Sequence, residues 1–498
     1  MKAKQPPQAS VFGGYGRSMK NLTGRFNLLI SLVAGITAAK ASHAASDPTP
    51  VSGGVTNEPI HLSQSSASAG AMATGTNAPA SDFRTTEEDS FHVHAMPAAE
   101  SKAMTLHPET FWRENTLLDD YGGWRSLMGQ YGIELLPVYV GEVMGNPSGG
   151  QKQGTIYDSS LNLPLTVSLD KLFNGWNGGK VFANVVWIAG RSLSADYVGD
   201  ISDTSNISGD DTVRVQELWY EQAFWQERAT LRAGLLEADA EFFTSDTASL
   251  FISGTFGAFT LAGVNLPNPP FYPMAAPAVR FRIEPTPRFY FQTGVFKANS
   301  GTQEENRNGL DYDFNGDDGV LVFSEIGCRI NQDKGELGLS GTYKLGAFVD
   351  TANFHNLNTG ASEGPDYGIY AVADQTLYRQ GSRHISFFTR GGGAPSDINT
   401  VNWYFDAGFN FAGFIPGRPD DTVGAAVARS WFSPDFQGTP SSGSTPPFSA
   451  ETVVEATWRI RVTPWWTLQP DFQYIFNPGG AEKTSDATVI GLRTTIVF

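Results

Sequence analysis

Several short stretches of the chain place charged and aromatic side chains at alternate positions. Glu217, Trp219 and Glu221 are separated by single residues, and Arg280 and Arg282 alternate with apolar residues. Alternate side chains of a β-strand point to the same face, so each set would share one face of a strand. A guanidinium offers a planar fork of donors, a carboxylate accepts hydrogen bonds, and an indole offers a flat apolar surface. Together these groups suit the reversible binding of a polar solute.

Other charged residues occupy similar positions. Arg232 alternates with apolar neighbours, Lys180 stands at the entry to the apolar stretch 181–189, and Glu142 lies on the polar parity of its strand. Arg214 falls on the apolar parity, so we expect it near a strand end or in a bulge. An alternative remains open, in which Arg and Glu pair with each other and only stiffen a wall. The candidate solute-binding residues are Glu142, Lys180, Glu217, Trp219, Glu221, Arg232, Arg280 and Arg282.

The strands that must position these residues have an unusual polarity. In residues 466–476, apolar residues at even positions oppose Thr467, Gln469, Asp471 and Gln473. The same pattern recurs in residues 401–411, 454–462 and 487–498. Strands of about 9–11 residues with aromatics near the ends of the apolar face are typical of transmembrane barrels.

The polar face of these strands decides between two fold classes. Asp, Arg, Gln and Asn cannot remain unpaired in a dry core. An antiparallel transmembrane β-barrel removes the conflict, because apolar groups face lipid and polar groups face a wet lumen. The alternative is a large soluble β-protein with one wet sheet face. We predict an all-β, transmembrane antiparallel β-barrel.

Composition excludes several other classes. The chain has 498 residues, of which only 17% are charged, and its net charge of −17 argues against nucleic-acid binding. After residue 50, no stretch approaches the ~20 consecutive apolar residues of a membrane helix. His355 and His384 are the only histidines after residue 107, and nothing nearby pairs with Cys328. We therefore expect no enzymatic activity.

The chain divides into three parts. Residues 1–44 have basic residues, an apolar run and a small-residue cleavage site, which predict a secretory signal cleaved after Ala44. Residues 45–105 are rich in Ser, Ala, Thr, Gly and Pro, which predicts a disordered periplasmic extension. Residues 106–498 would form the barrel region, which begins with a short helix over 124–131 that ends before Gly132 and a first strand over 133–144.

One acidic segment resembles half of a calcium-binding loop. Asp311, Asp313 and Asn315 occupy the first, third and fifth positions of an EF-hand loop, followed by Gly316 and Asp317. The bidentate Glu expected at the twelfth position is missing. A Ca²⁺ site at Asp311, Asp313, Asn315 and Asp317 and a solvated acidic turn are the two interpretations, and no other cofactor is expected.

The order of several motifs resembles one family. Their ranges are Leu118–Arg125, Gly132–Ile133, Tyr139–Asn146, Gln216–Gln222, Leu231–Gly234 and Trp465–Gly480. In sequence and spacing they resemble the carbohydrate-selective porins of the OprB family, from about residue 108 to the C-terminus. The resemblance implies a barrel of sixteen strands in the bacterial outer membrane that passes sugars by diffusion.

The resemblance also implies partners and leaves alternatives. We expect passive diffusion of small sugars, such as the monosaccharide glucose, into the periplasm through a charged, aromatic-lined constriction. The alternatives are a porin selective for anions or small acids, and a soluble secreted sugar-binding β-protein. Outer-membrane lipid would surround the barrel, and Phe498 resembles the terminal signature read by outer-membrane assembly machinery. A monomer and a homotrimer both remain open.

Overall fold

A computed structural model describes most of the predicted barrel region. The described residues are 114–173, 175–312, 314, 316, 318–332, 338–438, 449–481 and 484–498. The predicted signal and N-terminal extension, together with Asp313, Asn315 and Asp317, lie outside the described residues.

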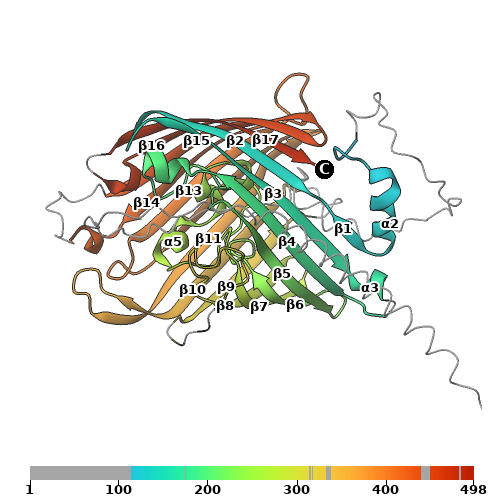
Figure 1. The fold of residues 1–498 in the computed structure, drawn as a ribbon, viewed down its shortest axis with the longest axis horizontal. Helices are drawn as coiled ribbons and strands as arrows, with labels where there is room; N and C mark the ends of the chain where they lie inside the picture. Colours follow the sequence, from blue (N-terminus) through green and yellow to red (C-terminus); the bar gives the residue numbers. More distant parts are fainter. Residues whose placement is uncertain are drawn as a thin grey trace, which may run out of the picture.

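Sixteen antiparallel strands form a closed barrel (Figure 1). Each strand from β2 to β17 pairs with the next one in the chain, and β17 pairs with β2 to close the circle. The fold prediction is therefore confirmed. The strands are β2 (Val138–Gly150), β3 (Gly154–Ser168), β4 (Gly179–Gly190), β5 (Thr212–Phe224), β6 (Ala229–Leu236), β7 (Ala276–Thr286), β8 (Phe289–Lys297), β9 (Val320–Ile330), β10 (Gly341–His355), β11 (Ser362–Gln380), β12 (Arg383–Gly393), β13 (Val401–Ala412), β14 (Thr422–Phe432), β15 (Ala450–Thr463), β16 (Trp466–Phe476) and β17 (Ser485–Val497).

The two faces of the barrel have the predicted polarity. In β13, Trp403, Phe405 and Phe409 are 58%, 45% and 41% exposed on the outside of the barrel. On the same strand, Asp406 and Asn410 are buried on the inside. An outer surface of exposed apolar side chains requires lipid rather than water around it. In the described part of the chain, no helix is long and apolar enough to span a membrane.

The first strand departs from the prediction. We expected one continuous strand over residues 133–144, but the structure has two, β1 (Ile133–Leu135) and β2, separated at Pro137. Proline has no backbone N–H and interrupts the ladder. The predicted helix is confirmed as α2 (Trp124–Gln130), and Gly132 follows it with a φ of 73°. A positive φ is a conformation that glycine adopts without strain, so the helix ends here.

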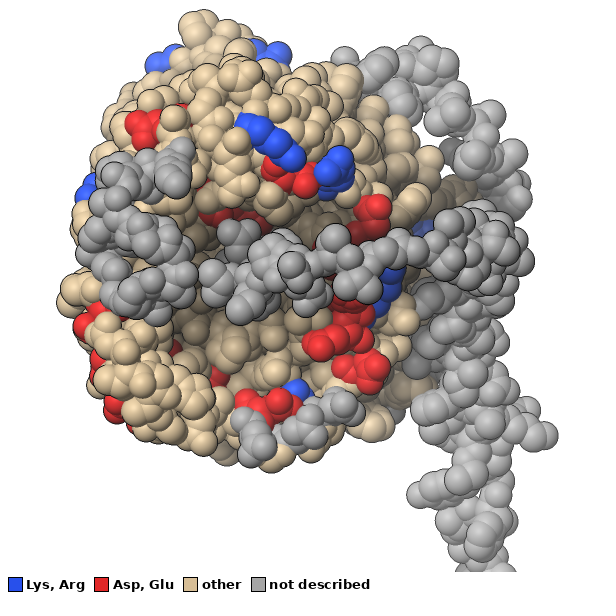
Figure 2. Space-filling view, turned by 60° about the vertical axis from the view of Figure 1, so that its left-hand side comes forward, with Lys and Arg blue, Asp and Glu red and all other residues tan. Residues whose placement is uncertain are grey.

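The connections differ strongly between the two ends of the barrel. Short turns such as 225–228, 287–288, 381–382 and 464–465 lie at the end that also carries the C-terminus (Figure 1). Longer connections, including 191–211 and 237–275, lie at the other end. In barrels of this kind the short turns are periplasmic and the long loops extracellular. Figure 2 shows the long-loop end, where acidic side chains surround a hollow.

Short helices occur in the connections. They are η2 (Tyr121–Gly123), α3 (Leu169–Leu172), the π-turn η3 (Ser194–Val198), η4 (Ala248–Leu250), α4 (Gly254–Gly257), α5 (Thr260–Asn265), η5 (Asp435–Gly438) and η7 (Pro478–Gly480).

Residues 237–275, here called the constriction loop, fold back into the barrel. Phe242 stacks on Phe323 of β9 with ring centroids 5.1 Å apart, and Phe243 meets Tyr370 of β11 at 5.8 Å. All four side chains are fully buried. The burial of large aromatic side chains is a main source of the free energy that stabilises a folded protein. The constriction loop therefore forms an apolar core inside a barrel whose own inner wall is polar.

Charged side chains of the wall hold the backbone of the constriction loop. Glu455 of β15 accepts hydrogen bonds from the backbone N–H groups of Ile252 and Ser253 at 2.6 and 2.9 Å. Arg390 of β12 donates to the carbonyl oxygen of Thr255 at 2.9 Å and pairs with Asp406 at 2.6 Å. These hydrogen bonds satisfy backbone N–H and C=O groups of the loop, which would otherwise be buried without a partner.

Candidate functional site

Three of the predicted site residues lie side by side on the inner wall. Strand register places Glu221 of β5 opposite Arg232 of β6, and Arg232 opposite Arg280 of β7. Alternation turns all three side chains inward, as the sequence predicted. They meet the constriction loop at the point where it leaves β6.

The constriction loop supplies a fourth member, Glu241. Glu221 Oε2 lies 2.9 Å from a terminal guanidinium nitrogen of both Arg232 and Arg280. Glu241 pairs with Arg232 through one oxygen and with Arg280 through the other, the latter at 3.1 Å. We call Glu221, Arg232, Glu241 and Arg280 the Arg–Glu quartet. Its two cations and two carboxylates are bridged in a closed circuit that joins loop to wall.

Burial and charge act in opposite directions on Glu241. Burial alone would raise the pKa of its carboxyl, but the guanidinium groups of Arg232 and Arg280 outweigh burial and hold the pKa below its ordinary value. The side chains of Arg232 and Glu221 are 18% and 13% exposed, against 4% for Arg280 and 9% for Glu241. Arg232 and Glu221 are therefore the members that present most surface to the lumen.

Trp219 lies against Arg232 of the quartet. Its ring stacks on Phe182 with centroids 4.9 Å apart, and the Arg232 guanidinium carbon lies 3.7 Å from the ring centroid. Only 8% of Trp219 is exposed. Both faces of the indole are therefore occupied, and direct stacking on a solute would require Arg232 to move. The immediate role of Trp219 in this conformation is to support the Arg232 guanidinium.

A second group of polar residues lies beside the quartet. Arg282 donates to Glu284 at 2.7 Å, and Arg329 donates to both oxygens of Glu284 at 3.1 and 3.0 Å. Both guanidinium groups lie over the ring of Tyr290, at 4.0 and 4.9 Å. Tyr290 in turn donates to the buried carboxylate of Glu325 at 2.8 Å. Arg282 thus belongs to the same wall as the quartet, as predicted.

The remaining predicted residues are not members of the quartet. Glu142 of β2 is fully buried and pairs with Arg493 of β17, so it stands on another part of the wall. Lys180 is exposed near the periplasmic end of β4 and lies opposite Glu221 in register, so it is a cross-strand neighbour of the quartet. Glu217 is partly buried and accepts a long contact of 3.5 Å from the backbone N–H of Glu237. The register shift predicted around Arg214 is present, between Asn184 and Val185 of the neighbouring strand.

Sequence reasoning missed Glu241 and a group of cations on the far wall. Glu241 lies outside any strand, so alternation gave it no face. Arg459 and Arg461 of β15 face the lumen near the periplasmic turn 464–465, and within the described residues neither side chain has a hydrogen bond or an ion pair. Arg379 contacts only the Ser340 hydroxyl, at 3.4 Å. These arginines were visible in the sequence, but nothing there showed that they would lack acidic partners.

The calcium hypothesis remains a prediction. Asp311 is exposed, and the other three proposed ligands lie outside the described residues. Among the residues that the structure does describe, no group of three or more His, Cys, Asp or Glu side chains is arranged to hold a metal ion.

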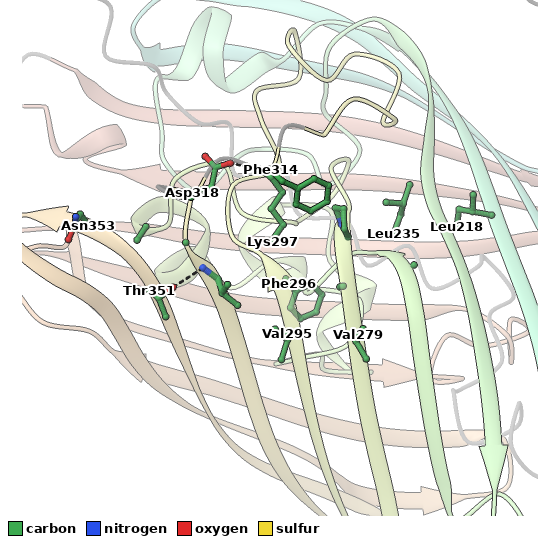
Figure 3. Close-up of a pocket in the computed structure, with 17 residues that line it drawn as sticks. Leu218, Leu235, Val279, Val295, Phe296, Lys297, Phe314, Asp318, Thr351 and Asn353 are labelled. Carbon is green, nitrogen blue, oxygen red and sulfur yellow. Dashed lines mark hydrogen bonds and ion pairs between the residues drawn. The ribbon is translucent and has the colours of Figure 1, made fainter.

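One cavity of the described chain lies outside the lumen. It measures about 970 Å³ and is lined by outward-facing side chains, among them Leu218, Val279 and Val295 (Figure 3). These three are 43%, 46% and 46% exposed on the lipid-facing wall. The cavity therefore does not lie on a path through the barrel.

The fold and this site together define the class of protein to which the chain belongs. A closed barrel of sixteen strands with an apolar outer band, a polar inner wall and an inward-folded loop is the architecture of a bacterial outer-membrane porin. A soluble sugar-binding protein is excluded, because a water-soluble chain would not expose this outer surface.

Comparisons with known proteins agree and narrow the class. The family model described as "Carbohydrate-selective porin, OprB family" matches residues 152–498. Porin B of Pseudomonas aeruginosa is 27% identical over 442 residues, covering 80% of this chain and 94% of that protein. The putative porin QuiX of Acinetobacter baylyi is 21% identical over 430 residues, covering 79% and 96%. The high-pH structure of Pseudomonas putida OprB superposes with a TM-score of 0.71 at 24% identity, covering 80% of this chain and 100% of that one.

The chain belongs to the OprB family of carbohydrate-selective porins. It is a channel of the outer membrane and not an enzyme, and its solutes are carbohydrates.

Proposed function

We propose that this porin passes small neutral sugars, monosaccharides such as glucose, by passive diffusion through a constriction that the Arg–Glu quartet and the constriction loop line together. The observation that carries the proposal is the quartet itself. Arg232 and Glu221 present donors and acceptors to the lumen at one depth, and their charges are balanced by Arg280 and Glu241. A balanced set offers hydrogen bonds without favouring a charged solute.

The proposed mechanism is brief competition for hydrogen bonds. A sugar hydroxyl can accept from Arg232 while another donates to Glu221, and both groups return to each other when the sugar leaves. Because the quartet is already paired, the net free energy of such an exchange is small. Conduction needs this balance, since a solute must bind well enough to enter and weakly enough to leave.

The test is permeability measured with a matched panel. We expect liposomes carrying the protein to swell faster in glucose than in a sugar acid of similar size, and glucose to reduce ion current in planar bilayers. Equal swelling in neutral sugars and sugar acids, with no reduction of current by sugar, would overturn the proposed solute.

A second candidate is selectivity for anions or small acids. The observation that favours it is the group of Arg379, Arg459 and Arg461 near the periplasmic turns of the far wall, for which the described residues provide no acidic partner. Reversal potentials in a salt gradient separate the candidates. A strong anion preference together with faster passage of acids than of sugars would favour the second.

Export and assembly are further proposals. We infer that the mature chain begins near Ala45, which N-terminal sequencing of the membrane-extracted protein tests. We also infer that Phe498 guides assembly. Its backbone N–H donates to the carbonyl of Pro137 at 2.9 Å, so the chain end joins the barrel seam. Deleting Phe498 should lower the folded yield in the outer membrane, and an unchanged yield would contradict this role.

A further inference from the structure

Helix α2 has an apolar face that the described protein does not cover. Trp124, Leu127 and Tyr131 are 65%, 45% and 40% exposed. Their spacing of three and four residues puts them on one face of the helix. Ser126, which lies on the other side of the helix from Trp124, is also exposed and donates to the carboxylate of Asp120. The helix is short but amphipathic, with its apolar side outward.

Two contacts place this helix at the periplasmic end of the barrel. Met128 packs against a cluster that includes Ile133 and Val167. Val167 belongs to the outward parity of β3, together with the exposed Tyr157. Arg125 donates to the carbonyl oxygen of Phe498 at 2.6 Å, next to the end of β17. Figure 1 shows α2 beyond the strand ends, near the C-terminus.

The same end of the barrel carries other exposed aromatics. Trp176, Phe224 and Trp225 are 51%, 44% and 71% exposed in the connections and strand ends between β3 and β6. Aromatic side chains gather where a membrane-spanning barrel passes from hydrocarbon to water. The apolar face of α2 continues this belt from the lipid-facing wall.

We propose that α2 lies in the lipid–water interface of the periplasmic leaflet, with Trp124 and Leu127 inserted among phospholipid headgroups. The helix contacts the barrel on the side that faces lipid, so phospholipid is the neighbour that the wall already provides. Interfacial helices bury their apolar face about 5–10 Å into the boundary between headgroups and acyl chains. The side of the helix that carries Ser126 then remains in water.

The experiment uses single-cysteine variants of the full chain. Cys328 is the single cysteine, and Cys328→Ser gives the background. Leu127→Cys reports the apolar face, Ser126→Cys on the same helix is the matched aqueous control, and Leu345→Cys, at a lipid-facing position that is 56% exposed, is the lipid reference. Each is labelled with an environment-sensitive fluorophore and placed in nanodiscs of phosphatidylethanolamine and phosphatidylglycerol, whose two faces are both open to solvent.

The label at Leu127→Cys should emit at shorter wavelength than the label at Ser126→Cys. Nitroxide lipids should quench the Leu127→Cys label, with a nitroxide near the headgroup more effective than one at the chain end, whereas aqueous iodide should quench only the Ser126→Cys label. Iodide quenching of both helix labels would overturn the proposal. Protection of the Leu127→Cys label from both quenchers would indicate a second copy or another segment of the chain, and would overturn it too. The measurement needs no sugar, so its result is independent of the proposed solute.

Discussion

Two walls of the lumen use arginine in opposite ways. On the wall of β5–β9, here the matched wall, Arg232 and Arg280 are each shared by two carboxylates. On the wall of β11–β15, Arg390 pairs with Asp406, but at the periplasmic end of β15, here the unmatched wall, Arg459 and Arg461 have no acidic partner among the described residues. A paired guanidinium fixes geometry and cancels its own field, whereas an unpaired one leaves its field in the lumen.

The difference teaches what each wall controls. Loss of a charge from the matched wall should disturb the constriction loop, because Glu241 belongs to the loop. Loss of a charge from the unmatched wall should alter ion preference alone. The following predictions test that separation, beginning with the largest expected effect.

Replacing Glu241 with Ala should have the largest effect. It leaves Arg232 and Arg280 to share Glu221, and breaking a buried ion pair costs on the order of 3–5 kcal/mol. Some of that cost is relieved here by lumen water, since Arg232 is 18% exposed. We expect a loosened constriction loop, higher single-channel conductance and a shift toward anions.

The matched control for Glu241→Ala is Glu305→Ala. Glu305 is an exposed carboxylate that accepts hydrogen bonds from the backbone N–H and the hydroxyl of Thr302. This control should leave conductance unchanged. Equal conductance in the Glu241→Ala and wild-type channels would show that the quartet does not hold the loop.

Arg280→Ala tests the same wall with the opposite charge. The quartet then carries an excess of negative charge, so anion preference should fall, and the lumen should widen because a long side chain is removed. The barrel itself should still fold, since lumen groups carry little of its lipid-facing stability. Heat-modifiable electrophoresis measures folding, and bilayer recordings measure the pore. If the variant folds poorly but each folded barrel still transports normally, the role of Arg280 is only to stabilise the wall.

Replacing Arg459 and Arg461 with Gln tests the unmatched wall. Removing two unpaired positive charges should lower anion preference in reversal-potential measurements, most clearly at low salt, where screening is weak. Folded yield should not change, because no partner is left unpaired. Arg429→Gln, at an exposed position on the same sheet, is the control. If the double variant keeps its ion preference, the field of the unmatched wall does not reach the permeating ion.

Trp219→Ala should have a smaller effect on the matched wall. Loss of its contact with Arg232 should weaken the reduction of ion current by sugar by about 1 kcal/mol, or several-fold in apparent affinity. Trp187→Ala is the control, because Trp187 is 55% exposed on the lipid-facing side. The effect would be assigned to the lipid face rather than the lumen if both variants changed sugar binding equally.

The smallest predicted effect depends on pH. Burial, and then the neighbouring carboxylate of Asp200, raise the pKa of Asp203 to about 7 in the loop between β4 and β5. A carboxyl with a raised pKa favours the folded state when protonated, so its contribution is full below its ordinary pKa and is lost as pH rises through about 7. Asp203 also accepts, through its backbone carbonyl, a hydrogen bond from Gly254 of the constriction loop at 2.9 Å.

Current noise from loop movement should therefore increase between about pH 6 and pH 8 in the wild type. In Asp203→Asn, which cannot ionise, this increase should be smaller. An identical pH dependence in both channels would exclude Asp203 as its source.

The strands could be predicted because alternation is a local property. Residues 466–476 showed both faces in the sequence, and β16 has those bounds in the structure. Alternation also put Glu221, Arg232 and Arg280 on inward faces, which the register confirms. Even the bulge near Arg214 followed, because a charge on the lipid-facing parity demands a local break.

The inside of the barrel was decided only by the tertiary structure. Glu241 lies outside any strand, so no alternation in the sequence around it predicts its orientation. It completes the quartet because the constriction loop folds back onto the wall. The sequence likewise showed Trp219 on an inward face but not that Phe182 and Arg232 would cover it. Alternation determines which face a side chain takes, since it depends on neighbours along the chain. Which partner it meets depends on residues far away in sequence: Arg280 meets Glu221 of another strand and Glu241 of the loop, whereas no carboxylate of the described residues pairs with Arg459.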